Sequence, residues 1–79
     1  MTPTDILMPE LTDQAENGVV TAWMVDEGGH CDSGQLVAEV QAIKVDDQIY
    51  APHAGTVVDR VGINVGVATG EPICRIIPD

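Results

Sequence analysis

The sequence contains no phenylalanine, one tryptophan, one tyrosine and only three basic residues among its 79 positions. A protein that binds nucleic acid needs a patch of lysine and arginine to displace counterions from the phosphates, so three basic residues argue against that function. Thirteen acidic residues and a net charge of −10 argue equally against an anionic membrane surface. A negative field of this kind suits docking to basic protein surfaces.

Two further absences limit the setting of the protein. No apolar run approaches the roughly 20 residues of a membrane-spanning helix, and the N-terminus lacks the basic start and apolar stretch of a secretory signal. The two cysteines, Cys31 and Cys74, fit no metal-binding or redox spacing. We therefore expect free, buried thiols in a reducing compartment, either the bacterial cytoplasm or the mitochondrial matrix.

The chain does contain a series of short segments rich in Val and Ile, separated by Gly, Pro, Asn and Asp. β-Branched residues favour strands, and the residues between the segments favour turns. A chain this short buries only roughly 60% of its unfolded surface, so we expect one domain over residues 1–79 with a thin core. The pattern predicts an all-β sandwich or barrel, with strands at residues 5–8, 18–25, 35–42, 45–51, 55–62 and 71–77.

The two halves of the chain resemble each other. The segment "GVVTAWMVDEGGHCDSGQLVAEV" starts at Gly18, and "GTVVDRVGINVGVATGEPICRI" starts at Gly55. With one residue dropped, the alignment pairs the following positions: Gly18 with Gly55, Val20 with Val57, Cys31 with Val67, Gly34 with Gly70, Val37 with Ile73 and Val40 with Ile76. Neither half can bury its apolar face alone, so the repeat predicts a flattened sandwich or barrel with internal pseudo-two-fold symmetry.

The only lysine of the chain, Lys44, lies where the two halves join. Ile43 and Lys44 separate the segments "QLVAEVQA" and "VDDQIYA", which is the length of a tight two-residue hairpin loop. The loop lacks the Asn-Gly or Asp-Gly of a type I′ turn, so the turn type stays open. The hairpin places the Lys44 amine at the outermost point of the domain.

The segment "QAIKVDDQIYAPHAGTV" resembles the attachment segment of biotinyl/lipoyl carrier domains, which reads roughly E-x-x-K-x-x-x-E-I-x-A-P-x-x-G-x-V. Lys44 lies eight residues before Pro52, as the modified lysine does in that family, and the positions that match after it are Ile49, Ala51, Gly55 and Val57. The resemblance implies a flattened barrel of two four-stranded antiparallel sheets with the modified lysine at a hairpin tip. It also implies lipoate or biotin attached covalently to Lys44.

The neighbours of the lysine favour biotin, whereas the first half of the chain favours lipoate. Ile43 and Val45 resemble the apolar residues on both sides of the lysine in biotinyl domains, although the lipoylated carrier of glycine cleavage also has an apolar residue before its lysine. The first half of the chain resembles the lipoyl domains of 2-oxo acid dehydrogenase acyltransferases in three features. These are the segment Met8-Pro9-Glu10-Leu11, the nine-step path from Pro9 to Gly18, and Trp23. We favour lipoate, with a biotin carboxyl carrier as the alternative. Gln41 departs from the family pattern, which has Glu three residues before the lysine.

The resemblance implies a non-catalytic swinging-arm domain that carries acyl groups between active sites of a 2-oxo acid dehydrogenase complex. The partners it implies are a lipoate ligase or lipoyl transferase, a thiamine-dependent dehydrogenase component, an acyltransferase core and a flavin-dependent dihydrolipoyl dehydrogenase. In that family the loop that corresponds to residues 10–17 lies beside the lysine turn and contributes to recognition by the dehydrogenase. No nucleic acid, membrane or metal ion is expected as a partner.

Simpler interpretations compete with these. An unmodified interaction module would use the same fold and dock through its acidic surface, with Lys44 as an ordinary surface lysine. Asp46 and Asp47 are adjacent on a strand and point to opposite faces, so they do not form a catalytic pair. A small hydrolase would need His30 and Cys31 as its machinery, but no further group completes a catalytic or metal site.

Three single residues complete these expectations. We expect Trp23 to be a partly buried strand residue. We expect His53 to lie next to the lysine hairpin and cover its flank. We expect Gly55 to adopt a backbone conformation that only glycine tolerates well.

Overall fold

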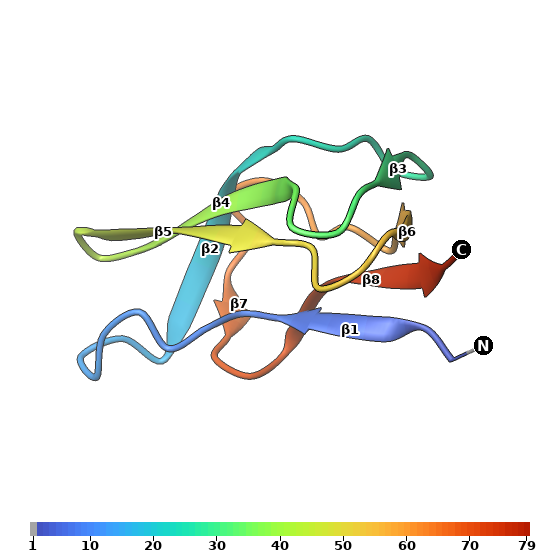
Figure 1. Cartoon of the computed structure of the whole chain (residues 1–79). Coiled ribbons are helices and arrows are strands. Elements are labelled where there is room, and N and C mark those ends of the chain that lie inside the picture. The colour runs from blue at the N-terminus through green and yellow to red at the C-terminus, as the bar shows by residue number, and fades with distance from the viewer. Residues whose placement is uncertain (1) are drawn as a thin grey trace.

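The computed structural model describes residues 2–79, which form two four-stranded antiparallel sheets and contain no helix (Figure 1). The strand order is β1-β8-β6-β3 in one sheet and β5-β4-β2-β7 in the other. The strands are β1 (Thr4–Leu7), β2 (Asn17–Trp23), β3 (His30–Cys31), β4 (Leu36–Ala42), β5 (Val45–Tyr50), β6 (Gly55–Val58), β7 (Val67–Ala68) and β8 (Pro72–Pro78). This architecture confirms the predicted all-β fold. Over the part of the chain that is described, no helix is long and apolar enough to cross a membrane.

The six predicted strands are all present, but the prediction missed two others. The short strands β3 and β7 lie in segments that we interpreted as turns, and each pairs only with one longer strand, β3 with β6 and β7 with β2. The segment 55–62 also forms a shorter strand than expected. β6 ends at Val58, because Asp59 has a φ of 57° and turns the chain out of the sheet.

The strand registers confirm the internal repeat. Gly18 in β2 pairs with Val67, and Gly55 in β6 pairs with Cys31. These are the positions that the sequence alignment makes equivalent, so the two halves use the same pairings in two different sheets. The matched residues Val20 and Val57 pair in the same way, with Val40 and Ile76 respectively.

Two glycines show the same symmetry in the turns. Gly34 and Gly70 have φ values of 81° and 88°, in the left-handed region that favours glycine. The Gly34 N–H donates to the Ala51 carbonyl over 2.8 Å, and the Gly70 N–H donates to the Met8 carbonyl over 2.9 Å. In each case the glycine N–H therefore bonds to the residue just before a proline, which is Pro52 for Gly34 and Pro9 for Gly70.

The core lies between the two sheets and is almost wholly aliphatic. Burying each such side chain contributes roughly 1.5–3 kcal/mol. Both cysteines are free and fully buried, as predicted. The largest fully buried side chains are Met8, Val20, Cys31, Val37, Val40, Val57, Ile73, Cys74 and Ile76.

Gly55 is required for close packing and not for its φ, which corrects our expectation. Its φ lies outside the positive range. A Cβ atom at this position would overlap the backbone carbonyl oxygen of Ile77 on β8 and lie 2.7 Å from Cγ2 of Ile76. The absent side chain lets β6 and β8 approach each other at this point.

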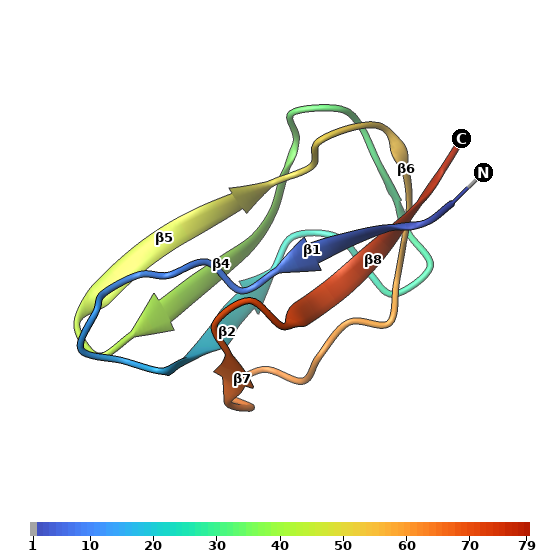
Figure 2. The same ribbon diagram turned by 90° about the horizontal axis from the view of Figure 1, so that it is seen from below.

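The molecule is elongated, with extents of 37 × 21 × 20 Å. The turn between β4 and β5 lies at one end, and both chain termini lie at the other (Figures 1 and 2). The loop between β1 and β2 lies at the same end as the β4–β5 turn in both views. The β4–β5 turn therefore lies at the end of the molecule opposite the termini.

Candidate functional site

The β4–β5 hairpin places Lys44 at its apex, as predicted. The two strands pair without interruption from Ala38 and Ile49 to Ala42 and Val45, which leaves Ile43 and Lys44 as the two loop residues. Lys44 is exposed. The pairing fixes the position of the Lys44 backbone, and its four-carbon stem extends from there into solvent.

The turn has an unusual backbone at Ile43. Its φ is 56°, whereas the φ of Lys44 is not positive. A positive φ at the first central residue is a feature of the tight hairpin turns, which normally have Gly, Asn or Asp there. A β-branched residue in this region is an outlier, and such strain costs on the order of 1–3 kcal/mol. The sequence did not reveal the strain, because no Gly or Asn marks the turn; the register of the hairpin imposes it.

Lys44 differs from the two arginines in its electrostatic environment. Arg75 lies 3.1 Å from Asp5, and the Arg60 guanidinium lies 3.8 Å from Glu27. Lys44 makes no ion pair or side-chain hydrogen bond to any residue in the 2–79 range.

Acidic residues lie on the two strands that carry the Lys44 loop. Glu39, Asp46 and Asp47, together with Gln48, line a shallow hollow of about 310 Å³ on the hairpin. Asp46 pairs with Gln41, and Asp47 pairs with the buried Val40, so the two aspartates occupy opposite faces of β5 as expected. Within residues 2–79 no three His, Cys, Asp or Glu side chains are grouped to hold a metal ion. The carboxylates give this end a negative field.

Backbone hydrogen bonds hold both ends of the β1–β2 loop. Met8 donates its N–H to the Glu71 carbonyl over 2.8 Å, and Thr69 donates its N–H to the Glu16 carbonyl over 2.9 Å. Asn17 then pairs with Ala68 at the start of β2. The loop between these anchors, residues 9–15, is thus a surface segment with fixed ends at the lysine-bearing end of the molecule (Figure 2).

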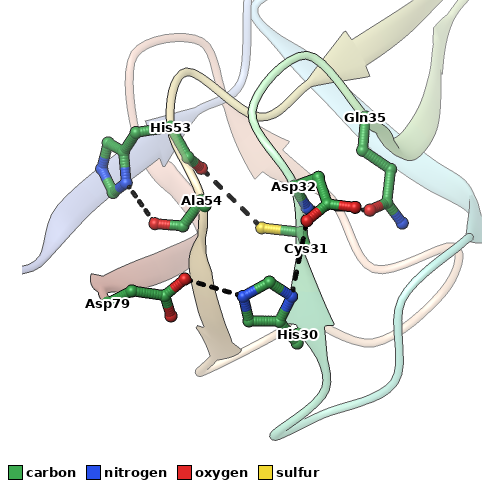
Figure 3. Close-up of polar contacts among 7 residues, drawn as sticks. All are labelled: His30, Cys31, Asp32, Gln35, His53, Ala54 and Asp79. Carbon is green, nitrogen blue, oxygen red and sulfur yellow. Dashed lines mark hydrogen bonds and ion pairs between the residues drawn. The ribbon is translucent and has the colours of Figure 1, made fainter.

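The pair His30–Cys31 does not form a nucleophilic site. The Cys31 Sγ is buried and points to the His53 carbonyl, 4.0 Å away, whereas the His30 ring points to Asp79 and Asp32 (Figure 3). Burial raises the pKa of the Cys31 thiol, which is the opposite of an activated nucleophile. The hydrogen bond from His30 to Asp79, 2.8 Å long, raises the pKa of His30. These residues link β3 to the end of β8.

His53 lies just beyond the base of the lysine hairpin, so the expectation that it lies next to the hairpin holds at the base and not at the Lys44 tip. It follows β5, at the end of that strand opposite Lys44, and its Nε2 accepts a hydrogen bond from the Thr4 hydroxyl over 2.8 Å. Its Nδ1 donates to the Ala54 carbonyl over 2.9 Å. The six-residue strand β5 separates His53 from the Lys44 tip.

Trp23 is partly buried, as predicted, and forms part of a cluster that the sequence did not reveal. Its Nε1 donates to the Val61 carbonyl over 3.0 Å, and the Arg60 guanidinium carbon lies 5.3 Å from its ring centroid. The Glu27 carboxylate accepts hydrogen bonds from the backbone N–H groups of Asp59 and Arg60, both 2.9 Å long. These bonds lower the pKa of Glu27 and join two loops.

Comparison with known proteins places these features in a family. The Biotin_lipoyl family profile, described as biotin-requiring enzyme, matches residues 4–76. The chain is 31% identical over 80 residues to a pyruvate dehydrogenase E1 component subunit beta of Rhizobium meliloti, covering 98% of this chain and 17% of that protein. It is 38% identical over 56 residues to a dihydrolipoyllysine-residue acetyltransferase component of the pyruvate dehydrogenase complex of Corynebacterium glutamicum, covering 71% of this chain and 8% of that protein.

Among solved structures, the fold is similar to a lipoyl domain of the 2-oxoglutarate dehydrogenase complex from Azotobacter vinelandii, with a TM-score of 0.77 at 21% identity. That match covers 94% of this chain and 95% of the other. The chain thus spans less than a fifth of each of the two longer relatives but nearly all of the solved domain.

Proposed function

The chain belongs to the Biotin_lipoyl family, and from this membership we propose that it is a lipoyl carrier domain with lipoate attached to Lys44. The observation that carries the proposal is the position of Lys44, exposed and unpaired among the described residues, at the tip of a two-residue hairpin. A free primary amine on a flexible stem fits amide formation with a carboxylic acid. Several relatives are named for a dihydrolipoyllysine residue, which supports lipoate as the attached group.

In this account the neutral amine of Lys44 attacks the activated carboxyl carbon that a lipoate ligase presents. A C–N amide bond forms, the activating group leaves and one proton is released. Only the unprotonated amine is nucleophilic, and no side chain among residues 2–79 bonds to it, so the ligase supplies the base. Conversion of the ammonium to an amide changes the net charge from −10 to about −11.

The fold supplies position and recognition. When bound, lipoate supplies a disulfide that accepts and releases acyl groups. The elongated shape holds Lys44 at the end opposite the termini, so a tether at either terminus leaves the arm free to reach other active sites. Tethering raises the effective concentration of the arm at each of them. The anchored loop at residues 9–15 and the acidic hairpin are the proposed contact surfaces for a thiamine-dependent dehydrogenase, an acyltransferase and a flavin-dependent dihydrolipoyl dehydrogenase.

Biotin on Lys44 is the second candidate. The observation that favours it is the pair of exposed apolar residues, Ile43 and Val45, on both sides of the lysine. A biotin carboxyl carrier would use the same hairpin with a different ligase and a different cargo. The proposed setting for either carrier is a reducing compartment, in which Cys31 and Cys74 stay as thiols.

Acyl loading tests the carrier role. The lipoylated domain is incubated with a thiamine-dependent 2-oxo acid dehydrogenase component and its 2-oxo acid, and its intact mass is measured. We expect an acyl increment on the wild-type domain and none on Lys44→Arg, which keeps the fold because the side chain is exposed and unpaired. A lipoylated domain that no member of a panel of such dehydrogenases loads would contradict the proposal.

A further inference from the structure

Ile43 is a β-branched residue that has both a positive φ and a high exposure to solvent. Its φ of 56° places it in the left-handed region, where the branched Cβ is crowded. Its side chain is nevertheless 60% exposed, so packing within the domain does little to offset the backbone strain.

The other positive-φ residues make the contrast clear. Within residues 2–79, Asp59 and Asn64 are the only other non-glycine residues in this region, and both residue types tolerate it. Their backbone N–H groups are also held, by the Glu27 carboxylate and by the Val20 carbonyl, at 2.9 Å in each case. Ile43 is therefore the residue whose side chain does not suit its conformation.

The hairpin register explains the positive φ of Ile43 but does not explain why this position is an isoleucine. Pairing of Ala42 with Val45 leaves a two-residue loop, and the turns favoured for such a loop have a positive φ at their first central position. Glycine, asparagine or aspartate at position 43 would relieve the strain. The stability of the free domain therefore gives no reason for an isoleucine.

The surroundings of Ile43 point to a contact outside the domain. Val45, on the other side of Lys44, is also exposed, at 39%, so two apolar side chains flank the amine. The acidic residues of the hairpin lie further from its tip, Asp46 and Asp47 on β5 and Glu39 on β4. An enzyme that acylates the Lys44 amine must enclose its four-carbon stem, and its rim then meets the residues on both sides of it.

We propose that Ile43 determines specificity in the acylation of Lys44, by packing its exposed side chain against an apolar patch at the rim of the lipoate ligase active site. This inference rests on the proposed function. The contact buries Ile43 only in the complex, so in the free domain the isoleucine reduces stability and gains nothing from burial.

The test compares three variants as substrates of a lipoate ligase supplied with lipoate and ATP. Ile43→Asn suits the left-handed backbone but removes the apolar contact. Ile43→Leu keeps an apolar side chain of equal size. Ile63→Asn is the matched control, because Ile63 is 52% exposed in the loop between β6 and β7 and its φ is not positive.

We expect Ile43→Asn to raise the Tm and yet lower the ligase kcat/KM by about tenfold or more, the loss typical of removing an apolar contact of this size. Ile43→Leu and Ile63→Asn should keep the kcat/KM within about twofold of the wild-type value, since neither removes that contact. A purely structural role for Ile43 would change the Tm and leave kcat/KM unaltered.

The inference is overturned if Ile43→Asn is acylated as fast as the wild type, or if Ile43→Leu loses as much activity as Ile43→Asn. A wild-type domain that gains no lipoyl mass at Lys44 would refute the proposed function and this inference with it. A modified wild type with an unaffected Ile43→Asn refutes the inference alone.

Discussion

Replacement of Gly55 with alanine should strongly destabilise the domain. The added Cβ overlaps the Ile77 carbonyl oxygen and lies 2.7 Å from Cγ2 of Ile76. The obstacle is the backbone of a paired strand, so no side-chain rotation removes it. Overpacking of this kind costs typically 1–3 kcal/mol, and a backbone clash belongs at the upper end. A domain of this size changes its Tm by about 4–8 °C per kcal/mol, so we expect a decrease of about 10–25 °C.

Two other glycines act as internal controls for thermal unfolding followed by circular dichroism. A Cβ at Gly66 meets no atom within 4 Å and its φ is not positive, so Gly66→Ala should leave the Tm unchanged or raise it slightly. A Cβ at Gly18, the counterpart of Gly55, would lie 2.7 Å from the Met8 sulfur. Because a methionine side chain can move, Gly18→Ala should cost less than Gly55→Ala. A Tm for Gly55→Ala close to that of Gly66→Ala would refute the reasoning.

Three further predictions concern the end of the molecule away from Lys44. Glu27→Gln should lower the Tm at pH 7, because the ionised Glu27 carboxylate stabilises the folded state and its pKa is lowered there. The Tm difference between the variant and the wild type should shrink as the pH falls below 4.5 and the carboxylate becomes protonated. Asp79→Asn should lower the Tm below pH 6.5 and lose its effect as the pH rises through the raised pKa of His30. A Tm difference independent of pH would contradict either prediction. Cys31→Ser should lose about 1–3 kcal/mol of stability in urea unfolding, because it buries a hydroxyl group. Acylation of Lys44 should be unchanged; its loss in the folded variant would show that Cys31 takes part in the functional site.

The fold was predictable where the sequence repeats itself. Gly18, Val20 and Val40 have counterparts at equivalent positions in the second half, and the registers place both sets in the same pairings. Local β-propensity and turn residues were enough to find six strands. The apex position of Lys44 followed from the two-residue gap between the two strands of the hairpin.

The remaining features depend on contacts that are distant in sequence. β3 and β7 have two residues each, too few to show a period, and they exist because they pair with longer strands. The role of Gly55 depends on how closely β8 approaches, and no local pattern reports that distance. The strain at Ile43 arises because the register leaves two residues for the turn whatever their type.

The most direct test of the central claim is the intact mass of the purified domain after incubation with a lipoate ligase and, separately, with a biotin ligase. We expect a lipoyl increment that peptide mapping assigns to Lys44, and no increment on Lys44→Arg. A biotin increment alone, or a lipoyl increment that persists in Lys44→Arg, would contradict it.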